Sequence, residues 1–457
     1  MNLNTTIVLN DLVEKYNVAA PRYTSYPTVP FWDNNQFSKE SWSNRVFLTY
    51  QASKQSGISL YIHLPFCESL CTYCGCNTRI TKNHTVEIPY IDSLLKEWGM
   101  YIHLLKDGAP LISEIHLGGG TPTFFSSQHL EKLITGILAH AHVATDASFS
   151  FEAHPGNTTH AHLKVLYGLG FRRLSLGIQD FDPLVQFVIN RKQDVEDVQR
   201  VMKEAREIGY TSINFDLIYG LPKQKLNTVR DTIEKSLLLS PDRISFYSYA
   251  HVPWIKPGQR HYTEKDLPYG ADKLALYTLG KQLIQQAGYE DVGMDHFAKP
   301  NDELFIACKE GRLHRNFMGY ADRYRPLLIG LGVSAISDAW NGFAQNVKTV
   351  EEYQKIIEQD QLPVVKGHLL NEEDLTIRRY ILDIMCKGET RIVKGFAANE
   401  DIVSRLQEMI ADDLVIIDED YIMLTSLGKP FLRNVCMAFD LKLQRHKEKE
   451  QLFSQAI

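Results

Sequence analysis

The chain has 457 residues, of which 44% are hydrophobic and 23% charged, the balance of a globular protein rather than a disordered or fibrous one. Its formal net charge of −6 argues against a nucleic-acid binder, which usually carries a basic surface. The sequence contains no apolar run of the roughly 18 residues that a membrane helix needs, and residues 1–4 lack the pattern of a secretory signal. We therefore expect a cytoplasmic protein that acts on neither nucleic acid nor membrane.

We interpret the first segment, residues 1–56, as one that covers a substrate site. Its most distinctive part is the stretch 21–28, Pro-Arg-Tyr-Thr-Ser-Tyr-Pro-Thr, which is rigid and aromatic. Its prolines and aromatic rings suit a lid over the site, and the alternative is a plug that closes one end of the following domain.

Residues 57–346 alternate β-rich and helical stretches at intervals of about 30 residues, the size of a βαβ unit. In the stretch 195–208 the apolar residues recur at spacings of three and four, which predicts one buried helix face. Six successive units predict an α/β fold with a parallel sheet curled into a full or partial (β/α)6 barrel, and a flat doubly wound sheet is the alternative. The predicted strands are 59–64, 114–117, 148–153, 173–177, 212–218 and 243–249, and the predicted helices are 88–105, 129–141, 160–169, 195–208 and 228–238.

Residues 347–457 are predicted to form a mostly helical C-terminal domain. Its end has the outline of a winged helix, with helices at 401–412 and 429–439 around strands at 415–418 and 421–424. The turn between the two strands is Asp418-Glu419-Asp420, which would repel phosphate. We therefore expect this part to pack against the barrel or to act as a lid, rather than to bind DNA.

The placement of the cysteines indicates a metal site. Four of the seven cysteines fall within one short stretch, at positions 67, 71, 74 and 76, directly after the first predicted strand. The spacing C-x3-C-x2-C can bring three thiolates to one iron–sulfur cluster, and three ligands on a [4Fe–4S] cube leave one iron free. The alternative is a structural zinc site with Cys76 as fourth ligand, although zinc ligands usually come as two separated pairs.

Cys67, Cys71 and Cys74, with Tyr73 before the third cysteine, resemble the signature of radical S-adenosylmethionine (radical SAM) enzymes. The segment Gly118-Gly119-Gly120-Thr121-Pro122 after the second strand resembles the glycine-rich motif of the same family. Glycines there would let the backbone approach a ligand closely. The resemblance implies a [4Fe–4S] cluster held by the three cysteines, with S-adenosylmethionine on the free iron and a 5′-deoxyadenosyl radical as the reactive species.

Further motifs narrow the resemblance to one family within that group. The ending Cys74-Gly75-Cys76-Asn77, the stretch 21–28 and the segments 293–298 and 313–317 are similar to those of oxygen-independent coproporphyrinogen III oxidases. These enzymes oxidatively decarboxylate two propionates of coproporphyrinogen III to vinyl groups, giving protoporphyrinogen IX. One departure is Ala153-His154-Pro155-Gly156, where relatives often have Val-Asp-Pro-Arg, so a role for that arginine has no support here.

The resemblance also implies two S-adenosylmethionine molecules and assigns their contacts position by position. The strand pattern independently places several of these residues at the carboxyl ends of strands, where barrel enzymes gather their active sites. The residues that match contacts to the first molecule are Tyr61, Gly119, Glu152 and Ile336. Those that match contacts to the second are Tyr73, Gly120, Thr121, Gln179, Arg191, Asp216 and Ala250.

The substrate and the redox partners complete these expectations. Coproporphyrinogen III carries four propionates, for which Arg22, Arg191, Arg315 and Arg323 are candidate partners, with Tyr23 and Tyr26 available to stack on pyrroles. Arg22 and Tyr23 are the substrate-side residues that we single out. We also expect an electron donor such as flavodoxin or ferredoxin, an unidentified electron acceptor, and a monomeric protein.

Three other functions stay open at this stage. A heme-binding chaperone would share the barrel and the cysteine loop, although such relatives typically have Cys-Asp-Phe where this chain has Cys74-Gly75-Cys76. A radical SAM methyltransferase acting on heme is a second possibility. A zinc-stabilised binding module without catalysis is the third, and it would be colourless.

Overall fold

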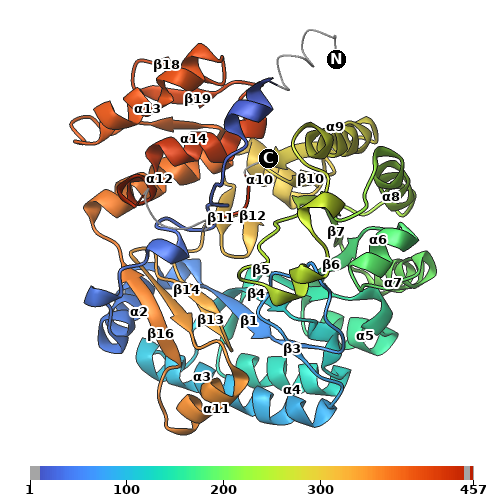
Figure 1. Cartoon of the computed structure of the whole chain (residues 1–457). Coiled ribbons are helices and arrows are strands. Elements are labelled where there is room, and N and C mark those ends of the chain that lie inside the picture. Colours follow the sequence, from blue (N-terminus) through green and yellow to red (C-terminus); the bar gives the residue numbers. More distant parts are fainter. Residues whose placement is uncertain (1–10, 447–452, 456–457) are drawn as a thin grey trace.

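The computed structural model describes residues 11–446 and 453–455 (Figure 1). Its centre is one twelve-stranded sheet in the order β16-β15-β14-β13-β1-β4-β5-β6-β7-β8-β10-β9. The strands from β13 to β8 in this order run parallel, and antiparallel strands extend the sheet at both edges. The sheet curls without closing, which confirms the predicted partial barrel.

All six predicted barrel strands form, in the predicted order, and helices connect them along the outside of the sheet (Figure 1). The predicted limits differ from the observed ones mainly at the strand starts. The strands are β1 (Ile58–Leu64), β4 (Leu111–Gly119), β5 (His142–Ala153), β6 (Phe171–Gln179), β7 (Ser212–Tyr219) and β8 (Arg243–Ser248). The helices are α3 (Glu87–Leu105), α4 (Ser127–Leu138), α5 (His160–Gly168), α6 (Pro183–Val188), α7 (Val195–Ile208), α8 (Leu226–Leu238) and α9 (Ala271–Gln286).

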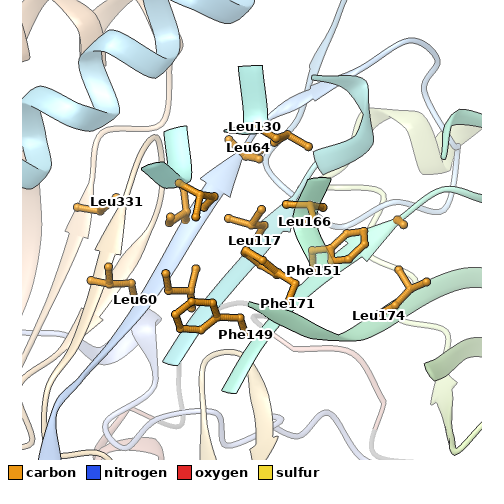
Figure 2. Close-up of a cluster of buried hydrophobic side chains, with 14 of the residues drawn as sticks. Leu60, Leu64, Leu117, Leu130, Phe149, Phe151, Leu166, Phe171, Leu174 and Leu331 are labelled. Atoms are coloured by element: carbon orange, nitrogen blue, oxygen red, sulfur yellow. The ribbon is translucent and has the colours of Figure 1, made fainter. Parts of the chain in front are cut away.

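The main core lies between the outer face of the sheet and these helices. Figure 2 shows part of it, where Leu117 and Phe151 from neighbouring strands meet Leu130 of α4 and Leu166 of α5. Successive side chains of a strand point to opposite faces. The outward residues of each strand are therefore apolar and buried under helices, and the inward residues are free to be polar.

Helix α7 shows why its limits could be predicted from the sequence. Val198, Val201, Met202 and Ala205 form its buried face, at the spacings of three and four that the sequence displays. Gly209 ends the helix with a left-handed backbone (φ +116°), a conformation that glycine adopts without steric cost. Both signals are local, so both ends are correct to the residue.

The N-terminal segment does not act as one covering unit. Helix α2 (Lys39–Ser53) packs on the outside of the barrel, where Trp42 is fully buried and its indole nitrogen donates to the Tyr101 hydroxyl (3.3 Å). Only the part before α2 runs past the end of β8, where Arg22 donates to the Ser248 carbonyl. The prediction that residues 1–56 form a substrate-covering segment is therefore wrong for α2, which is a structural part of the barrel. Residues 1–10 of that segment lie outside the described part of the chain.

The edge of the sheet next to β1 extends further along the sequence than predicted. Strands β13 (Leu328–Leu331), β14 (Ile336–Asp338) and β15 (Gly342–Asn346) are followed by α11 (Val350–Glu358) and then by β16 (Val364–Leu369), which pairs with β15. At the opposite edge β10 (His296–Ala298) and β9 (Glu290–Gly293) add two short strands. The predicted boundary at 346/347 thus falls inside the barrel unit.

The C-terminal domain begins with α12 (Glu372–Lys387) and has its own hydrophobic core. Strands β17 (Glu389–Arg391), β18 (Val415–Asp418) and β19 (Tyr421–Leu424) form a small sheet beside α13 (Asn399–Ala411), α14 (Leu432–Phe439) and α15 (Leu441–Arg445). The two predicted strands are correct to the residue. Among the described residues, no helix is both long enough and apolar enough to cross a membrane.

Candidate active site

The cysteine loop follows β1 at the carboxyl end of the barrel. Its base is fixed by a short parallel pair, β2 (Phe66–Cys67) with β3 (Arg79–Ile80), in which the Arg79 amide donates to the Pro65 carbonyl (2.8 Å). Cys67, Cys71 and Cys74 are free thiols on the wall of a cavity of about 640 Å³. The loop thus presents three sulfurs to one enclosed space.

The thiols differ in their surroundings. Burial raises the pKa of Cys67 to about 11, whereas a hydrogen bond from Cys76 lowers the pKa of Cys74 to about 6. Arg191, from the segment after α6, points its Nη1 at the sulfur of Cys71 (3.8 Å). The guanidinium thus places a positive charge beside the cysteine loop.

Two glycines at the end of β4 allow the neighbouring strand and loop to approach. A Cβ on Gly120 would lie 2.6 Å from the carbonyl carbon and oxygen of Pro65, and one on Gly119 would lie 2.6 Å from the His63 ring. Gly119 also has a left-handed backbone (φ +111°). The Gly120 amide donates to the Leu64 carbonyl (2.8 Å), and the Thr121 hydroxyl lies 3.3 Å from the sulfur of Cys67. The glycine-rich strand end therefore lies directly against the cysteine loop.

Glu152, at the end of β5, lies where three cavities meet. Its carboxylate accepts from the Gly119 amide (3.1 Å) and lies 3.6 Å from His116 Nε2. Burial acts to raise the pKa of Glu152, but the hydrogen bond and charge of His116 outweigh it and leave the pKa below its usual value. Glu152 lines the cysteine cavity, a second cavity of about 440 Å³ beside Tyr61 and Ile336, and a third of about 220 Å³ inside the barrel.

The opposite wall of the cysteine cavity comes from β6, β7 and the segment after α6. Asp216 accepts hydrogen bonds from Ser175 (2.7 Å) and Asn214 (2.9 Å), and burial raises its pKa to about 6. Gln179 Oε1 and Arg191 Nε are buried without any hydrogen-bond partner. Because an unsatisfied buried polar group is costly, these two atoms indicate a wall shaped for a polar ligand.

These observations fit an iron–sulfur cluster with a bound nucleoside cofactor. Three thiols, a nearby guanidinium and a cradle that has no room for Cβ atoms surround the cysteine cavity, which is large enough for a small-molecule cofactor. In the described part of the chain, no three His, Cys, Asp or Glu side chains lie close enough together to hold a single metal ion. A cluster is wider than one ion, so its ligands need not converge on one point.

The structure brings most of the predicted site residues together. Tyr61 and Ile336 line the second cavity beside Gly119 and Glu152. Ala250 lines neither cavity, but its carbonyl and that of Tyr73 both accept from Gln259 Nε2 (3.2 and 3.0 Å). The predicted site residues that line the cysteine cavity are Cys67, Cys71, Tyr73, Cys74, Gly119, Gly120, Thr121, Glu152, Gln179, Arg191 and Asp216.

Comparisons with known proteins agree with this geometry. The Radical SAM superfamily model matches residues 61–235. Curated oxygen-independent coproporphyrinogen III oxidases of Salmonella typhimurium and Synechocystis are 38% and 36% identical to this chain, each over 98% of it and over 98% and 97% of their own lengths. The chain belongs to the family of oxygen-independent coproporphyrinogen III oxidases. The solved coproporphyrinogen III oxidase (HemN) of Escherichia coli, described as a radical SAM enzyme, superposes with a TM-score of 0.85 at 36% identity, covering 92% of this chain and 97% of that one.

Membership of this family implies a [4Fe–4S] cluster and S-adenosylmethionine. It favours the oxidase over the three alternative functions, namely the zinc module, the heme chaperone and the methyltransferase. The barrel from β1 to β8 and the C-terminal domain are both covered by the relatives. The matching region of the superfamily model begins at Tyr61 and ends within α8, so it contains the cysteine loop and the glycine-rich strand end.

The substrate-side prediction for this family member needs a correction. Tyr23 and Tyr26 are 2% and 1% exposed and pack in the core of the C-terminal domain, where the Tyr23 hydroxyl donates to Asp440 (3.1 Å). Their rings therefore have no free surface for a pyrrole. The sequence of a short stretch with two tyrosines does not show which part of the protein their rings will pack against.

The four candidate arginines have different environments. Arg22 is partly exposed, donates to the Ser248 carbonyl (2.6 Å) and lies 3.8 Å from Asp295. Arg315 is buried against Tyr320 and lies 3.4 Å from the Arg22 carbonyl, with two of its guanidinium nitrogens unpartnered. Arg323 pairs with Asp146 and Asp322 away from the cysteine cavity. Arg191 belongs to the cavity wall.

The interior of the barrel is polar, which was not predicted from the sequence. Interiors of this kind usually hold layers of branched apolar side chains, but here the inward positions of β4 to β8 are polar. These polar residues alternate with the apolar outward residues, so an examination of every second residue in each strand would have found them. The clearest set, all lining the cavity inside the barrel, is His116, Ser150, Ser175, Asn214 and Ser245.

His154, at the departure from the usual family sequence, also lines the cysteine cavity. Burial, followed by the charge of Arg191, lowers its pKa to about 3, so the imidazole is neutral at pH 7. It accepts a hydrogen bond from the Gly156 amide (3.1 Å) through Nδ1, which fixes the turn after β5.

Proposed function

We propose that this chain catalyses the oxygen-independent conversion of coproporphyrinogen III to protoporphyrinogen IX, in which two propionates become vinyl groups with loss of carbon dioxide. The observation that carries the proposal is the cavity in which the three loop cysteines meet the glycine-rich end of β4, in a chain related over its full length to enzymes of that name. When bound, the cluster and S-adenosylmethionine supply the radical that removes a hydrogen atom from a propionate chain.

Residues of this chain would then hold and orient the cofactors. We assign Cys67, Cys71 and Cys74 to the cluster, and Tyr61, Gly119, Glu152 and Ile336 to the first S-adenosylmethionine. Support comes from the second cavity, in which the last four residues lie together beside Cys76. The Glu152 carboxylate suits ribose hydroxyls, as acidic residues do in dinucleotide sites, and its lowered pKa keeps it an acceptor at neutral pH.

We assign seven residues to a second S-adenosylmethionine. Ala250 lies outside the cysteine cavity, and its carbonyl shares Gln259 Nε2 with that of Tyr73. The six that line the cavity are Tyr73, Gly120, Thr121, Gln179, Arg191 and Asp216. Support comes from the unpartnered atoms of Gln179 and Arg191, which a ligand could satisfy. Arg191 carries a planar fork suited to a carboxylate, and S-adenosylmethionine has one.

Replacing Asp216 by Ala should weaken the binding of the second molecule and leave that of the first unchanged. A lost charged partner typically costs about 2–5 kcal/mol, a loss of more than tenfold in affinity. Equilibrium dialysis with labelled S-adenosylmethionine over a range of concentrations should give two sites per wild-type chain, and in the variant one site of wild-type affinity and one weakened more than tenfold. The variant should retain its iron and sulfide but make no vinyl product. Two sites of wild-type affinity with normal turnover would refute the assignment.

Arg22 is the remaining substrate-side candidate, because its guanidinium lies 5.9 Å from the ring of Tyr247, which lines the cysteine cavity. Arg22→Ala should raise the KM for coproporphyrinogen III about tenfold or more, since a hydrogen bond to a charged group contributes about 1.5–3 kcal/mol. The KM for S-adenosylmethionine should not change. Arg391→Ala, which removes an exposed ion pair with Asp420 in the small sheet, is the control. An equal change in both KM values would argue against the role. A truncated chain that begins at Gly57 would also lack α2, which belongs to the core, so its loss of activity would not report on Arg22.

The reaction also requires redox partners. We propose that a flavodoxin or ferredoxin donates the electron that reduces the cluster and that an external acceptor, not identified by this chain's residues, takes the electron left after decarboxylation. We further propose a monomer acting in the cytoplasm, where a reducing environment keeps its cysteines as thiols. Light scattering on the purified protein measures the oligomeric state.

One anaerobic assay tests the proposal as a whole. The reconstituted protein is incubated with coproporphyrinogen III, S-adenosylmethionine and a reductant, and the porphyrins are separated after oxidation. We expect protoporphyrin, together with a three-propionate intermediate at early times. A methylated tetrapyrrole, or tight heme binding without any decarboxylated product, would overturn it.

A further inference from the structure

Five large apolar side chains lie exposed around the outside of the cysteine loop. Phe187 and Leu184 face outward from α6 and are 71% and 56% exposed, and Leu70 is 41% exposed in the loop itself. Trp254 and Ile255, also exposed, come from the loop after β8. We call these five residues the cysteine-loop patch. Single exposed apolar residues are common, whereas grouped ones mark interaction sites.

Hydrogen bonds hold the three segments of the patch together. Asn190, just after α6, donates through Nδ2 to the Leu70 carbonyl (2.7 Å), and Thr72 donates to the Val188 carbonyl (3.1 Å). Lys256, next to Ile255, donates to the Cys76 carbonyl (3.0 Å). Leu70 lines the cysteine cavity, and the other four patch residues lie on segments that are hydrogen-bonded to the cysteine loop.

The inner face of α6 is already used. Val185 and Ile189 pack with Leu221, Tyr249 and Tyr262 in a small buried cluster. Leu184 and Phe187, three residues apart on the same helix, face the other way and remain uncovered in the described structure (α6 lies at the right in Figure 1). Large aromatic and aliphatic side chains in that position favour contact with another molecule.

The charges at the edge of the patch are mostly positive. Lys192 lines the cysteine cavity together with Leu70, Lys256 binds the loop backbone, and Arg260 donates to the Pro253 carbonyl beside Trp254. Glu68 of the cysteine loop, which lies 3.7 Å from His84, and Asp182, which caps α6, add two acidic side chains. A basic edge on a chain of formal net charge −6 favours an acidic partner.

We propose that the cysteine-loop patch is the docking surface for a small acidic electron-carrier protein. The inference rests on the proposed function, because only a cluster in the loop requires an electron from outside. The carrier is oxidised by one electron, and the cluster is reduced by one. Electron tunnelling weakens steeply with distance, so the productive surface is the one closest to the loop thiols. Five apolar residues with a charged edge match the small, transient interfaces of redox proteins.

The first test compares two reductants on the reconstituted protein. Phe187→Glu places a negative charge in the centre of the patch, and Leu238→Glu places one on α8, at a side chain 85% exposed. Stopped-flow absorbance should show a tenfold or greater loss in the rate of cluster reduction by a reduced bacterial flavodoxin for Phe187→Glu, and none for Leu238→Glu. Dithionite, which needs no docking surface, should reduce both variants at the wild-type rate. Higher salt should slow the flavodoxin reaction of the wild type.

The second test needs no cluster. Cluster-free wild-type chain should bind flavodoxin by calorimetry or surface plasmon resonance, with a Kd at least tenfold lower than that of Phe187→Glu. Equal binding and equal reduction rates for the two would overturn the docking surface. A change in oligomeric state on Phe187→Glu, without an effect on flavodoxin, would assign the patch to self-association and also overturn it. Normal vinyl formation by Phe187→Glu with dithionite separates these outcomes from a failure of the proposed function.

Discussion

Replacing Cys67, Cys71 or Cys74 by Ala should abolish activity and remove the cluster. Each thiol lines the same cavity, and a three-cysteine site has no spare ligand. Anaerobically purified wild-type protein should be brown and contain equal amounts of iron and sulfide with little zinc. Each variant should be colourless and have almost none of either, measured by iron and sulfide assays and by visible absorbance. Circular dichroism checks that the variants fold.

Cys76→Ala is the matched control for these variants. Cys76 lies two residues beyond Cys74 and lines both large cavities, but the family resemblance does not include it among the ligands. We expect this variant to retain its iron, sulfide and colour. Stoichiometric zinc in colourless, folded wild-type protein would contradict the cluster assignment.

Gly120→Ala should weaken cofactor binding and destabilise the protein. Its Cβ would lie 2.6 Å from the backbone of Pro65 and 2.9 Å from the Leu64 carbonyl oxygen, and backbone atoms cannot move aside as a flexible side chain can. Overpacking of this kind costs about 1–3 kcal/mol, and it would push the strand end away from the cysteine loop. We expect S-adenosylmethionine affinity to fall more than tenfold and thermal stability to fall, measured by dialysis and calorimetry.

Gly99→Ala serves as the control. Gly99 lies within α3, and a Cβ there would meet nothing within 4 Å. Alanine is favoured over glycine in a helix interior by about 0.5–1 kcal/mol, so this variant should be as stable as the wild type or more so, with unchanged cofactor affinity. Equal behaviour of the two variants would mean that the contact with Pro65 has no role.

The barrel could be predicted from sequence because its signals are local. Alternating apolar residues, helix periodicity and the glycine after α7 each act within one element. Strand β16 was missed because its place depends on β15, across α11, and nothing within Val364–Leu369 requires that pairing. The mistaken domain boundary has the same cause. Long-range pairing, rather than local propensity, decides where a sheet ends.

The site was only partly predictable for a similar reason. The strand ends of a barrel converge, so the strand pattern alone was enough to expect Glu152 and Asp216 near one another. The approach of Arg191 to Cys71 depends on how α6 packs on the loop, and no spacing in the sequence contains that distance. Tyr23 was predicted to face the substrate, but its ring packs into the core of the C-terminal domain, a long-range contact that the sequence does not reveal.

The barrel strands have an apolar outer face and a polar inner face, so this chain should tolerate substitutions on the inner face better. Leu117 and Phe151 hold helices against the sheet, so large-to-small substitutions there should cost about 2–5 kcal/mol and impair folding. Ser150 and Ser175 line a cavity instead, so substitutions there that keep a hydrogen-bonding side chain should change the melting temperature much less. A mutational scan would thus separate into two alternating series along each strand. New substrate preferences could arise in one series without the other having to change.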